Sequence, residues 1–148
     1  GRCIAMKHYL LTWYGITDLR AALGFEPSAG PIAGALQTGK YTDAIILGYT
    51  NPNKPQNAFS GALKEEWEIL HSLSQQDRLT YPREKIQMIV DAICNTDNGH
   101  LLFQKYLQNI NHSVNICFIP FTASKAIAIF VRDKKLIFPI ASNLFMEA

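Results

Sequence analysis

The chain has 148 residues, of which 48% are hydrophobic, so it can fill the core of one domain and is not intrinsically disordered. Its 14 basic and 12 acidic residues give a net charge of +2, without the basic excess that drives binding to duplex DNA. No run approaches the roughly 20 apolar residues that span a bilayer, so we expect no membrane partner.

Cysteine and histidine patterns give no sign of a metal centre. The three cysteines are far apart, and none belongs to a C-x-x-C pair: Cys3, Cys94 and Cys117. The four histidines have no ligand spacing either, and we interpret each, His100 included, as a surface or helix-end residue. We therefore expect reduced thiols in a cytoplasmic protein, with no metal and no cofactor.

The chain divides into a short leader and one domain. Residues 1–5 precede a Met6-Lys7 pair that is typical of a natural start, so we interpret them as a remnant of cloning. No repeat or low-complexity tract interrupts residues 6–148, which we interpret as a single domain excised from a longer protein.

The first part of the domain has the pattern of a βαβ unit. Residues 8–14 (HYLLTWY) are an aromatic and aliphatic run that predicts a buried parallel strand. Residues 15–31 carry too many glycines and prolines for a helix throughout, so we expect a long loop. Pro31 suits the first turn of a helix over about 31–39, and residues 43–49 (DAIILGY) predict a second buried strand.

Helix and strand patterns alternate in the rest of the chain. Residues 50–57 (TNPNKPQN) have the turn chemistry of a ligand-facing loop. Apolar spacing then predicts an amphipathic helix over 58–75, a short third strand over 78–81, a helix over 83–94, a break at 95–99, a helix over 100–110 and a strand over 114–120. Residues 125–131 (KAIAIFV) fit a hairpin strand or a helix, of which we favour the helix, and 136–141 (LIFPIA) predict a closing edge strand.

These elements predict a Rossmann-like, doubly wound α/β fold with a mainly parallel sheet and helices on both faces. In such a fold, ligands bind outside the carboxyl ends of the strands, where helix N-termini offer free N–H groups. Three loops meet that description, and they supply the predicted ligand-binding residues: Trp13, Gly15, Ile16, Thr17, Asp18, Arg20, Thr50, Asn51, Thr122, Ala123, Ser124 and Lys125.

Side-chain chemistry is the reason for selecting these residues, although each group also has a purely structural interpretation. Thr17, Asp18 and Arg20 combine a hydroxyl, a carboxylate and a guanidinium that suit a ribose, a base edge and a phosphate, but Asp18 and Arg20 also fit a turn pair. The segment from Thr122 to Lys125 suits an anion at a helix start, or plain capping. Trp13 and Tyr14 suit base stacking, or the core.

Motifs of common nucleotide enzymes are absent. The sequence contains no G-x-G-x-x-G after the first strand, no G-x-x-x-x-G-K-[ST] and no G-x-S-x-G. Dinucleotide cofactors, P-loop chemistry and a hydrolase nucleophile elbow therefore have no support, and we assign no catalytic residue.

The stretches YLLTWYGITDLRAALG, GPIAGAL and TDAIILGYT resemble the opening of CRISPR-associated Rossmann-fold (CARF) sensor domains. The likeness covers roughly the first third of the chain and is greatest to domains fused to RNA-repair regulators and to multi-domain effectors of type III CRISPR systems. Farther on, Phe121, Ser124 and Lys125 differ from the Gly-Thr-Pro-like turn that such domains usually have.

The resemblance implies a cytoplasmic homodimer that binds a cyclic oligoadenylate, tetra- or hexa-adenylate, during antiviral defence. The signal then passes to a C-terminal effector outside this chain, and Gly15, Thr17, Asp18 and the segment from Thr122 to Lys125 face the ligand. Alternatives are an RNA-end or tRNA-fragment sensor that controls transcription, a ring nuclease that cleaves cyclic oligoadenylate, and a dimerisation domain without ligand.

Overall fold

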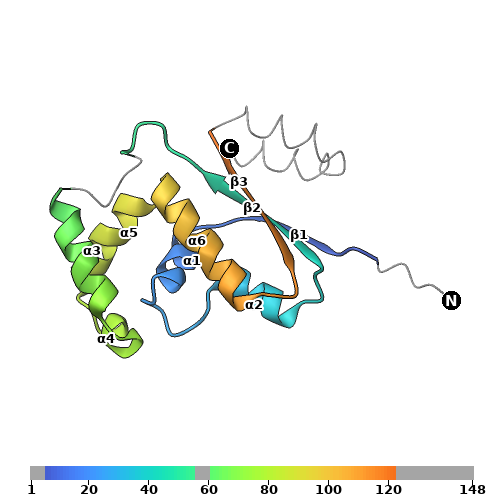
Figure 1. Cartoon of the computed structure of the whole chain (residues 1–148), viewed down its shortest axis with the longest axis horizontal. Helices are drawn as coiled ribbons and strands as arrows, with labels where there is room; N and C mark the ends of the chain where they lie inside the picture. Colours follow the sequence, from blue (N-terminus) through green and yellow to red (C-terminus); the bar gives the residue numbers. More distant parts are fainter. Residues whose placement is uncertain (1–5, 56–60, 123–148) are drawn as a thin grey trace.

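The computed structural model describes residues 6–55 and 61–122. They form a three-stranded parallel sheet in the order β1 (Tyr9–Trp13), β2 (Asp43–Tyr49), β3 (Asn115–Phe121), shown in Figure 1. The predicted α/β class and the parallel, Rossmann-like sheet are confirmed, and the three strands lie within one residue of their predicted ranges. β2 is buried as predicted, but β1 contains no buried residue, so the prediction that it is a buried strand is wrong.

Helices fill both connections between the strands. The first connection holds α1 (Ile16–Ala22) and α2 (Pro31–Thr38), and the second holds α3 (Ala62–Ser72), α4 (Gln75–Leu79), α5 (Arg83–Ile93) and α6 (Asp97–Ile110). Both connections join neighbouring parallel strands and step across the sheet in the same direction. Because such crossovers are right-handed, both place their helices on the same face of the described sheet, and the predicted helices on the other face stay a prediction.

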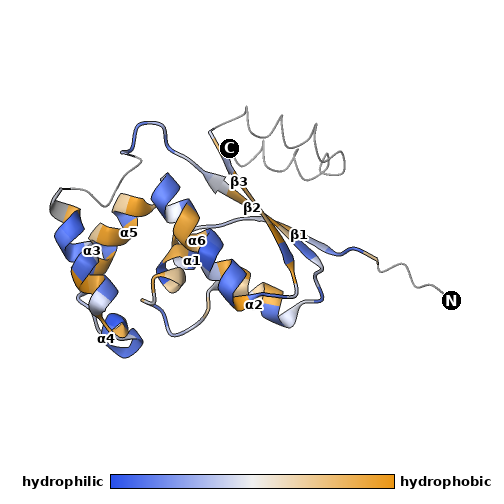
Figure 2. Ribbon diagram, in the orientation of Figure 1, coloured by the Kyte–Doolittle hydropathy of each residue, from blue (hydrophilic) through white to orange (hydrophobic). Residues whose placement is uncertain are grey.

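The two faces of the sheet carry separate apolar clusters. On the helical face, Ala44 and Ile46 of β2 pack with Leu36 of α2 and with Phe103 and Leu107 of α6. The opposite face carries side chains of the strands alone within its described cluster, centred on the buried residues Ile45, Leu47 and Phe121. Figure 2 shows the hydrophobic colouring of the strands beside the mixed colouring of α3 to α6.

A third cluster joins the helices to one another. Leu19 of α1, Leu70 of α3 and Ile89 and Ile93 of α5 are fully buried in it. These residues recur at helical spacing on amphipathic segments, as the apolar pattern of 58–75 and 83–94 predicts. The helical layer therefore has a core of its own beside the sheet.

Three sequence predictions need correction. Residues 78–81 are not a strand, because α4 ends at Leu79 and its start is capped by the Ser74 hydroxyl, which accepts the Asp77 N–H at 3.2 Å. Residues 15–31 are not a loop throughout, because α1 occupies seven of them. The last long helix begins at Asp97, not at His100, because Thr96 is its N-cap.

The predicted elements over 125–131 and 136–141 lie outside the described residues. Within the described ranges, no helix combines the length and the apolar character that crossing a bilayer requires.

Candidate functional site

The carboxyl edge of the sheet gathers the predicted segments that the structure describes. Trp13 pairs with Leu47, and Tyr49 pairs with Phe121. The same register continues past the strand ends, since the Tyr14 N–H donates to the Leu47 carbonyl at 3.2 Å and the Thr50 N–H to the Phe121 carbonyl at 2.8 Å. The segments that start at Gly15, Thr50 and Thr122 therefore leave the sheet side by side.

A buried histidine lies beneath this edge. The His100 ring in the first turns of α6 is hydrogen-bonded through Nδ1 to the Tyr14 hydroxyl and through Nε2 to the Thr50 hydroxyl, the latter at 2.9 Å. Only 4% of His100 is exposed, so it is not a surface residue, although it does lie near a helix end as predicted. The imidazole joins the ends of β1 and β2 through two hydroxyls.

The turn before α6 places His100 at this depth. Asn95 has φ 61°, a left-handed conformation that asparagine tolerates, and Thr96 then caps the helix by accepting the Gly99 N–H at 3.3 Å. Gly99 is required there, because a Cβ on it would lie 2.2 Å from the Ile93 carbonyl oxygen. The first turn of α6 can therefore pack closely against the end of α5.

The strand also makes room for the ring. A Cβ at Gly48 would lie 3.0 Å from Cε1 and Nδ1 of His100 and 2.7 Å from Cζ of Phe118. Glycine near the end of an otherwise apolar strand marks a close approach of another group, which here is the imidazole.

Burial controls the ionisation of the network. It lowers the pKa of His100, against smaller opposing effects of the Asp97 carboxylate and of a hydrogen bond with the Tyr49 backbone. Burial is also the main cause of the raised pKa of Tyr14, with the nearby Cys94 and Asp18 adding to it. Both rings are therefore neutral at physiological pH.

Asp18 has a structural position at the start of two helices. One carboxylate oxygen accepts the Gly15 N–H at 2.9 Å, and the other accepts the Ile32 N–H at 3.0 Å. The residue is 5% exposed. Its carboxylate thus caps α1 and holds the first turn of α2 against it, while Gly15 and Thr17 remain exposed.

Arg20 points away from the Tyr14 and Thr50 hydroxyls. Its guanidinium lies 3.4 Å from the Glu26 carboxylate, and both side chains are partly exposed. Arg20 and Glu26 also line a hollow of about 540 Å³ that they share with Tyr81 and Ile86. Within the described part of the chain, the Arg20 side chain pairs with Glu26, so the turn pair with Asp18 is not observed.

The two aromatic residues at the end of β1 face opposite sides of the sheet. Tyr14 stacks on Phe103 at a centroid distance of 4.5 Å and an interplanar angle of 12°, on the helical side. Trp13 packs edge-to-face on Phe121 at 4.7 Å, on the other side, and its buried indole Nε1 has no hydrogen-bond partner among the described residues. Ile16 is half-buried in the helical cluster.

The loop after β2 is fixed to the corner between α5 and α6. The Asn51 N–H donates to the Asn95 carbonyl at 2.9 Å, and the Asn51 side chain accepts the Asn53 N–H at 2.9 Å. The Lys54 ammonium donates to the carbonyls of Asp91 and Cys94 at 2.6 and 2.8 Å. These bonds hold Thr50 in position over His100.

Thr122 is exposed directly after β3. Ala123, Ser124 and Lys125 lie outside the described residues, so their predicted part in the site stays a prediction.

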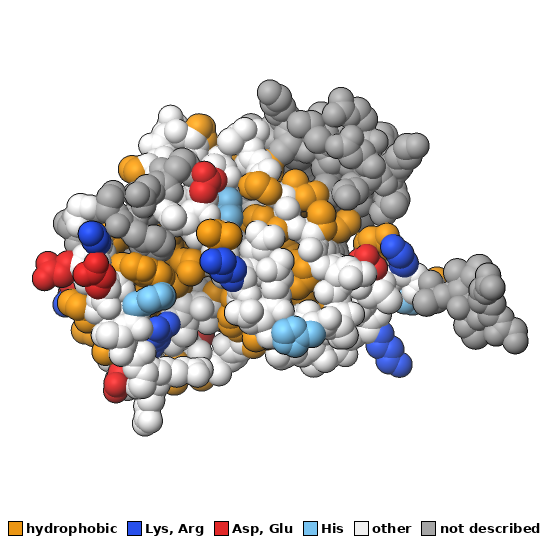
Figure 3. All heavy atoms as spheres, viewed as in Figure 1, with side chains coloured by type: hydrophobic (Ala, Val, Ile, Leu, Met, Phe, Trp, Pro, Cys, Tyr) orange, Lys and Arg blue, Asp and Glu red, His pale blue; other side chains and the backbone are white. Residues whose placement is uncertain are grey.

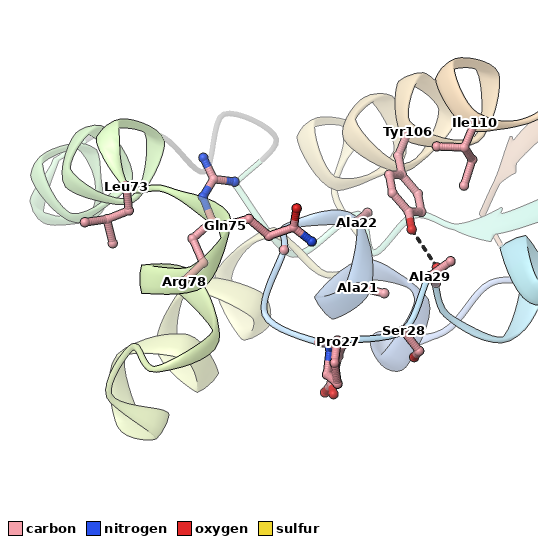
Figure 4. Close-up of a pocket in the computed structure, with 12 residues that line it drawn as sticks. Ala21, Ala22, Pro27, Ser28, Ala29, Leu73, Gln75, Arg78, Tyr106 and Ile110 are labelled. Carbon is pink, nitrogen blue, oxygen red and sulfur yellow. Dashed lines mark hydrogen bonds between the residues drawn. The ribbon is translucent and has the colours of Figure 1, made fainter.

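A larger hollow of about 570 Å³, which the sequence did not indicate, lies among α1, α4, α6 and the loop between α1 and α2. Figure 4 shows Gln75 and Arg78 on one side of it and Tyr106 on the other, with the Tyr106 hydroxyl donating to the Ala29 carbonyl at 2.7 Å. The Arg78 guanidinium donates to the Leu23 carbonyl at 3.1 Å. Arg78 thus ties α4 to the loop.

Positive charge is dispersed on the visible face of the molecule (Figure 3). On the face shown in Figure 3, lysine and arginine side chains are scattered singly around a band of hydrophobic atoms. Across residues 6–55 and 61–122, no three His, Cys, Asp or Glu side chains gather as metal ligands would. The site consists of hydroxyls, backbone groups and one neutral imidazole, which suits hydrogen bonding to an uncharged or anionic ligand.

The fold and this edge define an α/β domain of the Rossmann-like class, with a candidate ligand site at the carboxyl ends of its strands. Comparison of the chain with family models, with curated proteins and with solved structures gave no significant match.

Proposed function

We propose that this chain is a sensor domain that binds a cyclic oligoadenylate at the interface of a homodimer. The observation that carries the proposal is the shared edge at which the segments beginning at Gly15, Thr50 and Thr122 leave a parallel sheet. In open α/β sheets this edge is where nucleotides bind. The likeness of the first third of the chain to CARF domains supports the cyclic ligand.

Symmetry supports the dimer. A cyclic oligoadenylate with an even number of nucleotides has a two-fold axis, and an isologous pair of identical loops matches such a ligand most simply. Binding then couples the two subunits, and the signal passes to a C-terminal effector in the cytoplasm. The same edge is the site of the two alternatives, sensing of an RNA end and cleavage of the ring.

The first experiment is incubation of the chain with labelled cyclic tetra- and hexa-adenylate, with binding followed by calorimetry and ring opening by chromatography. Sedimentation velocity with and without the ring measures the dimer. Binding of an intact ring by a dimer is the expected result, and turnover indicates the ring nuclease. Failure of both rings to bind, or a monomer that stays monomeric with ligand, contradicts the proposal.

A matched pair of variants tests Arg20. Arg20→Ala and Glu26→Ala both abolish the same ion pair, but only the first removes the guanidinium. Donation to a phosphate at the edge requires the Arg20 guanidinium to leave Glu26 on binding. In that case Arg20→Ala weakens binding by about tenfold or more, since a hydrogen bond with a charged group contributes about 1.5–3 kcal/mol. Glu26→Ala leaves the affinity unchanged or higher. Lys125→Ala tests the second predicted segment in the same way.

A further inference from the structure

Three groups from separate elements form one hydrogen-bonded chain. Tyr14 follows β1, His100 lies in α6 and Thr50 follows β2. The Tyr14 hydroxyl meets Nδ1 of the imidazole, and Nε2 meets the Thr50 hydroxyl at 2.9 Å. The ring is held by packing as well, since Tyr14 meets it edge-to-face and Phe118 lies 5.5 Å from it, centroid to centroid.

The direction of the hydrogen bonds follows from chemistry. A buried phenol keeps its proton and must donate it, and the imidazole nitrogen opposite is its acceptor. A neutral imidazole has one N–H, so with Nδ1 accepting, the proton is on Nε2 and faces Thr50.

The consequence falls on Thr50. Its oxygen accepts from His100 Nε2, so its own proton cannot return to the ring and must point elsewhere. Among residues 6–55 and 61–122, this hydroxyl has no hydrogen-bond partner besides His100. Thr50 is half-buried at the carboxyl edge, so its proton is available to a group that binds there.

We propose that the chain from Tyr14 through His100 orients the Thr50 hydroxyl as a hydrogen-bond donor to a phosphoryl oxygen of the ligand. A phosphoryl oxygen can only accept, so it pairs with the Thr50 proton in every orientation, whereas a ribose hydroxyl can also present its own proton. Thr50 is the binding residue, while His100 and Tyr14 are positioning residues. The inference rests on the proposed function, because it assigns a role within the same site.

Two variants of Thr50 separate the effect of its hydroxyl from the effect of its side-chain shape. Thr50→Val keeps the branched side chain without the donor, and Thr50→Ser keeps the donor. With cyclic tetra- and hexa-adenylate as probes, we expect Thr50→Val to bind about tenfold more weakly and Thr50→Ser to bind within about twofold of the original chain. Circular dichroism verifies that both variants are folded.

Positioning is tested by a double-mutant cycle. Tyr14→Phe removes the donor that fixes the tautomer and is expected to weaken binding by about three- to tenfold, but to have no further effect in the Thr50→Val background. Tyr106→Phe is the control, because that half-buried tyrosine donates its hydroxyl proton to the Ala29 carbonyl at the other hollow. Nitrogen-15 spectra of the imidazole, recorded without ligand, report the tautomer directly.

The outcomes are distinct. If the chain binds a ring and Thr50→Val binds it equally well, or if the spectra show the proton on Nδ1, the inference is wrong and the proposed function survives. If neither ring binds, the proposed function fails and this inference fails with it. Additive losses in the cycle show that Tyr14 does not act through Thr50, and they also overturn the inference.

Discussion

Tyr14 and His100 lie 86 positions apart in the chain, yet the phenol hydroxyl of one and the imidazole of the other share a hydrogen bond beneath the carboxyl edge of the sheet. Their rings meet edge-to-face, with centroids 5.4 Å apart and planes at 81°. The pair fastens the end of β1 to the beginning of α6, so the geometry of the candidate site depends on the stability of the helical layer behind it.

The first prediction concerns pH. Burial lowers the pKa of His100 below its ordinary value of 6.5, so the unfolded chain binds this proton more readily than the folded chain. The free energy of unfolding should therefore be highest above about pH 6.5 and fall as the pH drops below it. Urea denaturation from pH 8 to pH 5 measures this dependence.

The control for this prediction is a second histidine. His112 is exposed just after α6, so His112→Gln should keep the pH profile of the original chain. His100→Gln should flatten it, because the titrating buried group is gone. A profile that is equally steep in both variants would assign the effect to other groups.

The second prediction compares two glycines. A Cβ at Gly48 meets Phe118 and His100 at 3.0 Å or less, so Gly48→Ala should lower the free energy of unfolding by about 1–3 kcal/mol through overpacking. Gly34, inside α2, has nothing within 4 Å of an added Cβ. Gly34→Ala should therefore raise the free energy of unfolding by about 0.5–1 kcal/mol, since alanine favours a helix. In thermal denaturation, we expect Gly48→Ala to be less stable and Gly34→Ala more stable than the original chain. Equal effects of the two substitutions would contradict the close approach at Gly48.

His100 shows what sequence patterns predict and what they miss. Taken alone, it has no neighbour at metal-ligand spacing in the sequence, and the expectation that it binds no metal stays a prediction. Its burial was nevertheless readable, because His100, Phe103 and Leu107 recur at helical spacing on the buried side of α6. Gly48 was the second signal. Which hydroxyls the ring meets depends on the tertiary packing of three elements, and no local pattern contains that.

Asp18 and the segment after β1 give the complementary lesson. The glycines and prolines of residues 15–31 indicated a loop. Asp18 nevertheless caps the start of α1 by accepting the Gly15 N–H, and a short helix forms over Ile16–Ala22. Strand positions were easier to predict, because β2 is apolar from Ala44 to Leu47 and buried on both faces there. Short helices depend on single capping contacts, so composition alone predicts them poorly.

The third prediction concerns Asp18. Asp18→Ala removes the acceptor of two N–H groups, one of them the buried Ile32 amide, and should lower the free energy of unfolding by about 2–3 kcal/mol. Asp18→Asn retains one acceptor oxygen, so its free energy of unfolding should lie between those of the original chain and Asp18→Ala. The neighbouring Thr17→Ala, at an exposed position, should stay within about 0.5 kcal/mol of the original chain. Urea denaturation decides, and a stable Asp18→Ala would indicate that the two helix starts are held by packing alone.

The fourth prediction concerns the loop that carries Thr50. The Lys54 ammonium donates to the Asp91 and Cys94 carbonyls at the end of α5, where the helix dipole favours a cation. Lys54→Met removes both bonds while keeping most of the side-chain stem. The loop should then open more often, and the Asn51 amide, which donates to the Asn95 carbonyl, should exchange its hydrogen about fivefold faster, equivalent to ~1 kcal/mol.

Hydrogen exchange followed by NMR measures this opening residue by residue. The matched control is Lys64→Met, at an exposed position on α3, which should leave the exchange of the Asn51 amide unchanged. Because the Thr50 N–H is bonded to the Phe121 carbonyl of β3, its amide should stay protected in both variants. Faster exchange at Thr50 as well would mean that Lys54 holds the end of the sheet together with the loop, whereas unchanged exchange at Asn51 would show that backbone bonds alone keep the loop over His100.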